Sequence, residues 1–262
     1  KLEDGLECKL FSRSSRGVVL TDEGRLLYDH VSEAFEALNE GEEKLKRSIE
    51  LGVGQLKIGV SSTLCKYMLL PYLKEFIHRN PHISISIECQ STNETLKLLD
   101  DDKIDIGLIG KPASLKTFNF YYLDNIEDIF VTTKDYLRNL SARGVKKSEI
   151  LQNSTLMLLD KGNMTRKYID DYLQENQIHV KDSIDISNMD LLIDFAKIGV
   201  GVACVIKSIV SKELADGTLI EIPLGIPIHK REVGFAYKES SKLSTSLQTF
   251  IKFYESYTPE DF

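Results

Sequence analysis

The chain has 262 residues, of which 42% are hydrophobic and 28% are charged, the balance of an ordinary globular protein. Its net charge of -7 excludes a protein that coats nucleic acid over its whole surface, although a local element could still contact DNA. The four cysteines are far apart and form no CxxC pair, which argues against a zinc site or a disulfide framework and favours a reducing cytoplasm. We expect no cofactor, no metal, no signal peptide and no membrane span.

The chain opens inside a structural element and continues into a β-hairpin. Its first residue is Lys1 rather than Met, so we expect either a processed gene product or an incomplete sequence. The run Phe-Ser-Arg-Ser-Ser-Arg-Gly at 11–17 ends in a glycine, and residues 18–20 have the composition of a short strand. This pattern predicts a hairpin whose tip carries Arg13 and Arg16.

A long amphipathic helix is predicted from Asp22 to Glu50, with Thr21 as its N-cap. Its length would be roughly 45 Å at 1.5 Å per residue. The apolar side chains follow an a/d seam formed by Leu27, Val31, Ala34, Leu38 and Leu45. Such a seam predicts a dimerisation helix, and the alternative is packing against the same chain. The two glycines at 51–54 predict a linker.

From residue 55 onward, strands alternate with helices, which is typical of an α/β domain with a parallel sheet and covering helices. Strands are predicted at 56–60, 83–89, 104–109, 126–132, 154–159, 183–186, 201–206 and 231–237. Helices are predicted at 64–80, 92–102, 164–176, 189–198 and 242–257. The apolar segment at 126–132 is expected to carry the chain into a second lobe.

The opening residues resemble the end of a LysR-type winged helix-turn-helix. The resemblance is carried by Leu2-Glu3-Asp4, Lys9-Leu10-Phe11, Arg13, Arg16-Gly17-Val18 and Leu20-Thr21-Asp22-Glu23-Gly24. It implies a partial winged helix-turn-helix at 1–21 (end of the recognition helix and wing), then a linker and dimerisation helix at 22–54. A two-lobed, periplasmic-binding-protein-like effector domain would follow at 55–262, with lobe I at about 55–130 and 230–262 and lobe II at about 131–229.

The chain departs from the family's pattern near its start. In the family, most of the helix-turn-helix lies before the position of Lys1, and the base-reading side chains belong to that part. The wing residues Arg13 and Arg16 are therefore expected to contact phosphates or a minor groove. Glu7 stands where the family usually has glycine, and Gly5 stands where it usually has an acid. We expect an altered turn after the recognition helix.

Three hydroxyl residues, Ser61, Ser62 and Thr63, follow the first strand of the α/β domain and precede a helix expected to begin near Leu64. Ligands bind beyond the carboxyl ends of strands in such sheets, and helix N-termini offer free N–H groups to anions. The alternative is plain N-capping. The resemblance implies effector contacts at this loop. Cys65 follows directly, and its place in a first helical turn favours either redox sensing or a small buried side chain.

Two later strands of the α/β domain are also followed by residues in positions equivalent to that of the Ser61–Thr63 loop. Thr92 and Asn93 come after the second strand, where each could cap the next helix or contact a ligand. Gly110 follows the third strand and either admits a ligand close to the backbone or forms a turn.

In the second lobe, Thr165 and Arg166 end a loop that resembles the family's Gly/Ser-rich loop, and they are expected to bind an anion. The alternative for Arg166 is an exposed helix charge. Asn188 ends a further strand and is expected to face the same crevice.

The order of wing, dimer-type helix and two-lobed domain predicts a cytoplasmic, ligand-gated transcriptional regulator. Its expected partners are operator DNA in the full-length protein, a second copy or more (homodimer or homotetramer), and a small anion or amino-acid-like effector. A solute-binding protein of a transport system shares the lobes and is the alternative. We do not expect an enzyme, because the sequence has no nucleophile elbow, metal triad or phosphate loop.

Overall fold

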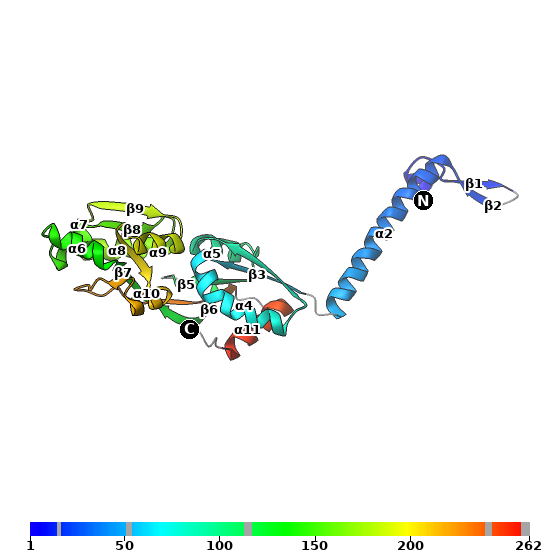
Figure 1. Ribbon diagram of the computed structural model, residues 1–262. Helices are drawn as coiled ribbons and strands as arrows, with labels where there is room; N and C mark the ends of the chain where they lie inside the picture. The colour runs from blue at the N-terminus through cyan, green and yellow to red at the C-terminus, as the bar shows by residue number, and fades with distance from the viewer. Residues whose placement is uncertain (15–16, 51–53, 113–116, 239–242, 258–262) are drawn as a thin grey trace. The chain divides into compact units, whose positions relative to one another are not determined.

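The computed structural model describes residues 1–14, 17–50, 54–112, 117–238 and 243–257, with the backbone alone at 14 and 44–50 (Figure 1). The chain divides into two compact units, Lys1–Gly54 and Gln55–Phe262. Arg16 lies outside the described residues, and so does the side chain of Leu45.

The first unit confirms the predicted hairpin and long helix. It contains α1 (Leu2–Gly5), β1 (Phe11–Ser14), β2 (Gly17–Leu20) and α2 (Asp22–Glu50). The two strands pair antiparallel, with Arg13 opposite Val18. Thr21 caps α2 as predicted, because its Oγ1 accepts the Gly24 N–H at 2.9 Å and donates to the Lys9 carbonyl at 2.7 Å.

Close packing joins the hairpin to the start of α2. A Cβ on Gly24 would lie 1.9 Å from the carbonyl oxygen of Leu10, so this position requires glycine. The Glu3 carboxylate accepts the backbone N–H groups of Leu10 at 2.7 Å and Phe11 at 3.2 Å, and these bonds lower the pKa of Glu3. The end of α1 is thereby fixed to the base of the hairpin.

The second unit has two lobes, each built on a five-stranded sheet. The sheet of lobe I has the order β4-β3-β5-β12-β6, formed by β3 (Gly54–Val60), β4 (Ile83–Cys89), β5 (Ile106–Gly110), β6 (Phe118–Ile126) and β12 (Arg231–Lys238). The sheet of lobe II has the order β11-β7-β10-β8-β9, formed by β7 (Asp128–Thr132), β8 (Thr155–Leu159), β9 (Asp182–Ile186), β10 (Val202–Ile206) and β11 (Ile220–Glu221).

Helices cover both sheets, and α5, α8 and α9 begin where the sequence predicts. Lobe I has α3 (Ser62–Leu64), a π-helical turn η1 (Cys65–Leu69), α4 (Leu70–Arg79), α5 (Thr92–Asp100) and α11 (Thr245–Ser256). Lobe II has α6 (Lys134–Ala142), η2 (Lys147–Glu149), α7 (Ile150–Asn153), α8 (Met164–Glu175), α9 (Met189–Lys197), η3 (Lys207–Val210) and α10 (Ser211–Asp216). The predicted helix at 64–80 is continuous from Ser62 to Arg79 and so begins two residues early.

The prediction of purely parallel sheets is wrong. β3 and β5 are parallel, as are β10, β8 and β9. However, β12 runs antiparallel to β5 and β6, and β7 runs antiparallel to β10 and β11. β12 and β7 lie next to the connections between the lobes. Each therefore enters its sheet from the end opposite to that at which the parallel strands begin.

The predicted strand at 126–132 is in fact parts of two strands. β6 ends at Ile126 in the sheet of lobe I, and β7 begins at Asp128 in the sheet of lobe II. Glu127 is the point at which the chain crosses. Most of β6 and all of α6, α7, α10 and β11 have no counterpart in the sequence prediction. For β6 the reason is that the mixed run FNFYYLDNI lacks a clean alternation of apolar and polar residues.

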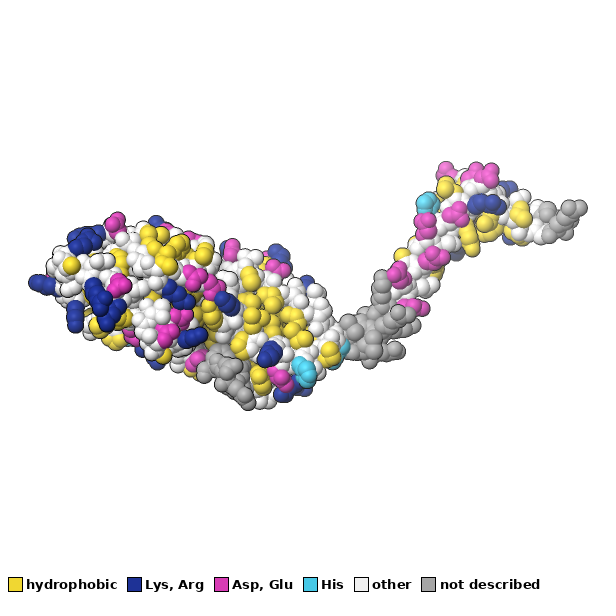
Figure 2. Space-filling model, viewed as in Figure 1, with side chains coloured by type: hydrophobic (Ala, Val, Ile, Leu, Met, Phe, Trp, Pro, Cys, Tyr) yellow, Lys and Arg dark blue, Asp and Glu magenta, His cyan; other side chains and the backbone are white. Residues whose placement is uncertain are grey.

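Apolar side chains remain exposed on helices of both lobes, and Figure 2 shows hydrophobic side chains gathered over α4 and near α9. They include Leu70, Ile77, Leu191, Phe195 and Ile198, and Ile198 is 74% exposed. None of the described helices is long and apolar enough to cross a membrane.

Candidate functional site

A buried ion pair joins the two connections between the lobes. Asp128 is the first residue of β7, and Arg231 is the first residue of β12. Arg231 donates from Nε to Asp128 Oδ2 at 2.7 Å and from Nη2 to Oδ1 at 2.8 Å. The Asp128 side chain is 0% exposed, and its burial raises the carboxyl pKa against the opposing effect of Arg231.

A network of exposed charges surrounds this pair. Lys230 Nζ lies 3.0 Å from the Glu127 carboxylate, and Lys207 Nζ lies 3.3 Å from Glu127 and 3.1 Å from Glu221. Hydrogen bonds from Lys230 and Lys207 lower the pKa of Glu127. The backbone N–H of Lys207 also donates to the Glu127 carbonyl at 2.8 Å, which fixes the crossing point against the end of β10.

Beside the ion pair, hydroxyl and amide side chains from both lobes line a small cavity of about 40 Å³, which we call the polar pocket. Its lining residues are Ser61, Thr63, Leu64, Ser91, Thr92, Gly110, Ile126, Asn163, Met164, Thr165, Ile206 and Arg231. Five of the predicted site residues, Ser61, Thr63, Thr92, Gly110 and Thr165, are therefore brought together here.

Three N-caps stand at the walls of the polar pocket. Ser61 Oγ accepts the Leu64 N–H at 3.3 Å, and Asn163 Oδ1 accepts the Thr165 N–H at 2.8 Å. The prediction that Thr92 or Asn93 caps α5 is wrong, because Ser91 forms a capping box with Glu94. Thr92 is consequently free to line the pocket, and only 7% of it is exposed.

Ser62, Asn93 and Asn188 are not among the residues that line the polar pocket. Ser62 and Asn93 are exposed in the first turns of their helices. Asn188 is the N-cap of α9, and its Oδ1 accepts the Leu191 N–H at 2.9 Å. Its observed contact is therefore an N-cap, a role that the sequence analysis did not give it.

Arg166 takes neither position expected from the sequence. It is not an exposed helix charge, since 7% of it is exposed, and it does not line the polar pocket. Its Nε contacts Asp170 at 2.8 Å, and its Nη1 contacts Asp185 at 2.5 Å and the Leu159 carbonyl at 2.9 Å. The carboxylates of Asp170 and Asp185 therefore already neutralise the Arg166 guanidinium.

The arginine that lines the polar pocket is Arg231, which no local signal in the sequence identified.

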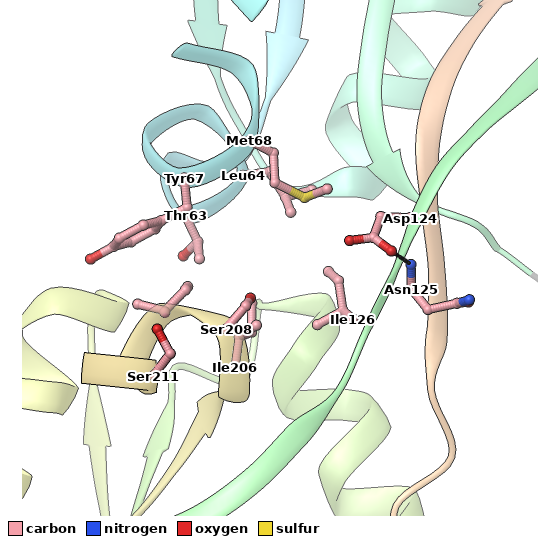
Figure 3. A pocket seen from close by; sticks show the side chains of 11 residues that line it. Thr63, Leu64, Tyr67, Met68, Asp124, Asn125, Ile126, Ile206, Ser208 and Ser211 are labelled. Atoms are coloured by element: carbon pink, nitrogen blue, oxygen red, sulfur yellow. Dashed lines mark hydrogen bonds between the residues drawn. The ribbon is translucent and has the colours of Figure 1, made fainter. Parts of the chain in front are cut away.

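A larger cavity of about 390 Å³ adjoins the polar pocket and shares Thr63, Leu64, Ile126 and Ile206 with it; we call it the apolar pocket (Figure 3). Its other lining residues are Tyr67, Met68, Asp124, Asn125, Ser208, Ile209 and Ser211.

A lobe-to-lobe contact lies at the apolar pocket. Lys66 Nζ lies 2.6 Å from Asp190 Oδ1, and the Tyr67 hydroxyl donates to the same oxygen at 2.5 Å. These bonds lower the pKa of Asp190. Both donors belong to the π-helical turn of lobe I, and Asp190 lies in the first turn of α9 in lobe II.

The Cys65 thiol does not have the low pKa expected of a redox sensor at a helix N-terminus. Burial raises its pKa, and the neighbouring Cys89 thiol raises it further. Cys89 ends β4, so the fold brings together two cysteines that are distant in the sequence.

Known proteins resemble this one over most of the chain. The LysR substrate binding domain family matches residues 50–258. The HTH-type transcriptional regulator YeiE of Escherichia coli (strain K12) is 24% identical over 253 residues, which cover 96% of this chain and 84% of YeiE.

Solved structures show the same fold. A Corynebacterium glutamicum OxyR C206 mutant has a TM-score of 0.66 and 23% identity, covering 96% of this chain and 79% of that one. The Synechocystis PCC6803 CcmR regulatory domain in complex with 2-PG has a TM-score of 0.64 and 19% identity, covering 76% and 95% of the two chains. At these identities the likeness establishes architecture, namely the two-lobed α/β domain.

Proposed function

The chain belongs to the LysR family of transcriptional regulators, and we propose that its effector-binding domain senses a small anion or an amino-acid-like metabolite at the polar pocket. The family match makes it a regulator rather than an enzyme or a transport solute-binding protein. The observation that carries the proposal is the convergence of Ser61, Thr63, Thr92 and Thr165 beside Arg231, between two lobes.

The chemistry of the polar pocket favours an anionic group. Hydroxyls of Thr63, Thr92 and Thr165 can donate to a carboxylate, and Gly110 leaves the end of β5 without a side chain. Arg231 adds a positive charge, and its Nε and Nη2 groups donate hydrogen bonds to Asp128. Among the described residues no acceptor contacts its Nη1, which can donate to a ligand. The 2-PG complex of CcmR supports the proposal that such domains hold small ligands.

Binding would change the angle between the lobes. The polar pocket has a volume of about 40 Å³, whereas small-molecule sites typically measure about 300–1,000 Å³. An effector must therefore widen it, and its walls belong to both lobes. A ligand that prefers the wider arrangement shifts the population toward it, and this differential affinity is the signal.

Operator DNA is the proposed partner of the full-length protein, in the cytoplasm and without a cofactor. The hairpin β1–β2 would act as the wing, with Arg13 at a backbone phosphate and Arg16 proposed from the sequence alone.

We propose self-association, as a homodimer or homotetramer, through the seam of α2. Val31 is 43% exposed and Leu38 is 64% exposed, while Leu27 is half-buried and Ala34 is exposed. A second copy of this helix would cover them, and the seam's remaining residue, Leu45, stays a sequence-based proposal. The exposed apolar side chains of α4 and α9 offer a further surface of the same kind.

The test is a thermal-shift scan against carboxylates, amino acids, their acetylated forms, sulfate, thiosulfate and phosphate. A ligand at 100 times its Kd adds about 2.7 kcal/mol, which raises the Tm by roughly 5–10 °C. Thr63→Val and Thr165→Val should abolish the shift. Thr249→Val is the matched control, because Thr249 is half-buried on α11, lines neither pocket, and donates its hydroxyl to the Thr245 carbonyl. A shift that persists in both pocket variants contradicts the proposed site.

A further inference from the structure

The apolar pocket has the size of a ligand site in its own right. Its volume of about 390 Å³ lies in the range of small-molecule sites, whereas the polar pocket next to it is about a tenth as large. Both lobes contribute to it: Thr63–Met68 and Asp124–Ile126 belong to lobe I, and Ile206–Ser211 belongs to lobe II. Figure 3 shows these three segments facing one another across the opening.

Most of the wall is apolar. Leu64, Met68, Ile126 and Ile206 keep only 6–8% of their surface exposed, and what remains exposed lines this space. Ile209 extends the same surface from lobe II. Such a wall favours a hydrocarbon or aromatic body, because covering it removes apolar surface from water.

One charge stands at the pocket. Among the described residues that line it, Asp124 and Tyr67 are the ionisable ones, and the Tyr67 hydroxyl already donates a hydrogen bond to Asp190. Asp124 Oδ1 accepts its neighbour's backbone N–H, that of Asn125, at 2.7 Å. Within the described part of the chain no lysine, arginine or histidine pairs with this carboxylate, and in Figure 3 it lies beside the opening.

The pocket's polar groups select the sign of the ligand's charge. A carboxylate ligand would meet Asp124 and be repelled, whereas an ammonium group would gain both an ion pair and hydrogen bonds. The Ser208 and Ser211 hydroxyls, on the opposite wall, can accept or donate further bonds. A metal ion is a poor fit, since the described residues contain no group of three or more His, Cys, Asp or Glu that could hold one.

We propose that the apolar pocket is a second ligand site, which binds a small organic amine with its ammonium group at Asp124 and its apolar body against Leu64, Met68, Ile126 and Ile206. The site adjoins the polar pocket, for which we proposed an anionic ligand, and shares four lining residues with it, but Asp124 lines only the apolar pocket. Residues of both lobes line the site, so a bound ligand would also affect the angle between the lobes.

The experiment is isothermal titration of the chain with 2-phenylethylamine and n-hexylamine, alongside the neutral 2-phenylethanol and n-hexanol and the anion hexanoate. Each amine should bind about two- to fivefold more tightly than its matched alcohol, because Asp124 is exposed and solvent screens its ion pair with the ammonium group. Hexanoate should not bind. Equal affinities for amine and alcohol, or no amine binding, would overturn the proposal.

Variants assign the binding to this pocket. Asp124→Asn keeps the shape and should weaken amine binding about two- to fivefold, leaving alcohol binding unchanged. Asp182→Asn, which changes an exposed carboxylate at the start of β9, is the matched control. Thr165→Val alters a residue of the polar pocket only and should leave amine binding intact. Undiminished amine binding in Asp124→Asn rejects the second site, whereas loss of effector binding in Thr165→Val bears only on the first.

Discussion

Asp128 and Arg231 begin the two strands through which the lobes are connected, and they form a bidentate ion pair at 2.7 and 2.8 Å. Arg231 lines the polar pocket, and its guanidinium group also lies over the Tyr168 ring at 5.2 Å. One contact therefore ties the hinge, lobe II and the proposed effector site together. A change at Arg231 should alter both stability and sensing.

Arg231→Leu should destabilise the effector domain by about 3–5 kcal/mol near pH 8, because it leaves the buried Asp128 carboxylate without its cation. Burial raises the pKa of Asp128 above its ordinary value, and loss of Arg231 should raise it further. A group with a raised folded-state pKa contributes stability at low pH and loses it as the pH rises through that pKa. The defect should therefore be smaller at pH 5, and urea unfolding at both pH values measures it.

The double variant Asp128→Asn/Arg231→Leu serves as the control for that experiment. It removes the buried charge along with its partner, so most of the stability should return. A defect of the same size at pH 5 and pH 8, with no recovery in the double variant, would show that packing of Arg231 matters rather than charge.

Asp190→Asn should loosen the contact between the lobes at the apolar pocket. The substitution weakens the bonds from Lys66 and Tyr67, and amide hydrogens of η1 and the first turn of α9 should exchange faster, by roughly threefold. The pKa of Asp190 is lowered, so in the unaltered chain the contact holds above its ordinary value of 3.8 and is lost as the pH falls through the folded-state pKa. The pKa of Lys66 is raised, so the upper limit lies above its ordinary 10.5.

Tyr67→Phe removes only one of the two bonds and should give a smaller increase in exchange than Asp190→Asn. Hydrogen exchange measured between pH 5 and pH 8, after correction for the intrinsic rate, should show a constant difference between variant and unaltered chain. A difference that changes across this range would mean that another group controls the contact.

The sequence predicted those parts of the candidate site that have a local signal. Ser61, Thr63, Thr92 and Thr165 each follow a strand, and this order places the first three at the strand ends of the lobe I sheet and Thr165 at a strand end of the lobe II sheet. Some helix starts could also be predicted, because an N-cap such as Thr21 contacts residues within one turn of the same helix and its signal is local in the sequence.

The arginines could not be assigned from the sequence. Arg166 lies next to Thr165 in the chain, yet its side chain turns to Asp170 and to Asp185 on the neighbouring strand. Arg231 meets Asp128 across a long separation in the chain, through the return connection between lobes. The crossing between the lobes at Glu127 does lie in the segment 126–132 from which it was expected, but the division of that segment between two sheets is a tertiary property.

Glu7→Gly should stabilise the first unit by about 1 kcal/mol. Glu7 has a φ of +52°, in the left-handed region that favours glycine, and the LysR-type pattern usually has glycine there. The gain is partly offset because glycine also loosens the unfolded chain. Glu7→Ala keeps the β-carbon and should give no such gain. Urea unfolding followed by circular dichroism of α2 distinguishes the two, and equal stabilities for the Gly and Ala variants would exclude relief of backbone strain.

Thr95→Val should stabilise the effector domain by about 1 kcal/mol. Thr95 is 0% exposed on α5, and its hydroxyl is buried without a hydrogen-bond partner. Its Cγ2 lies where Cβ atoms on Gly59 and Gly107 would come within 2.8 and 2.7 Å, so the helix packs directly on β3 and β5. Valine keeps this methyl contact and removes the unpaired hydroxyl. Thr95→Ser keeps the hydroxyl and loses the methyl, and should therefore destabilise. Urea unfolding midpoints for the two variants should move in opposite directions, and a loss of stability in both would mean that the hydroxyl is satisfied in solution by a buried water.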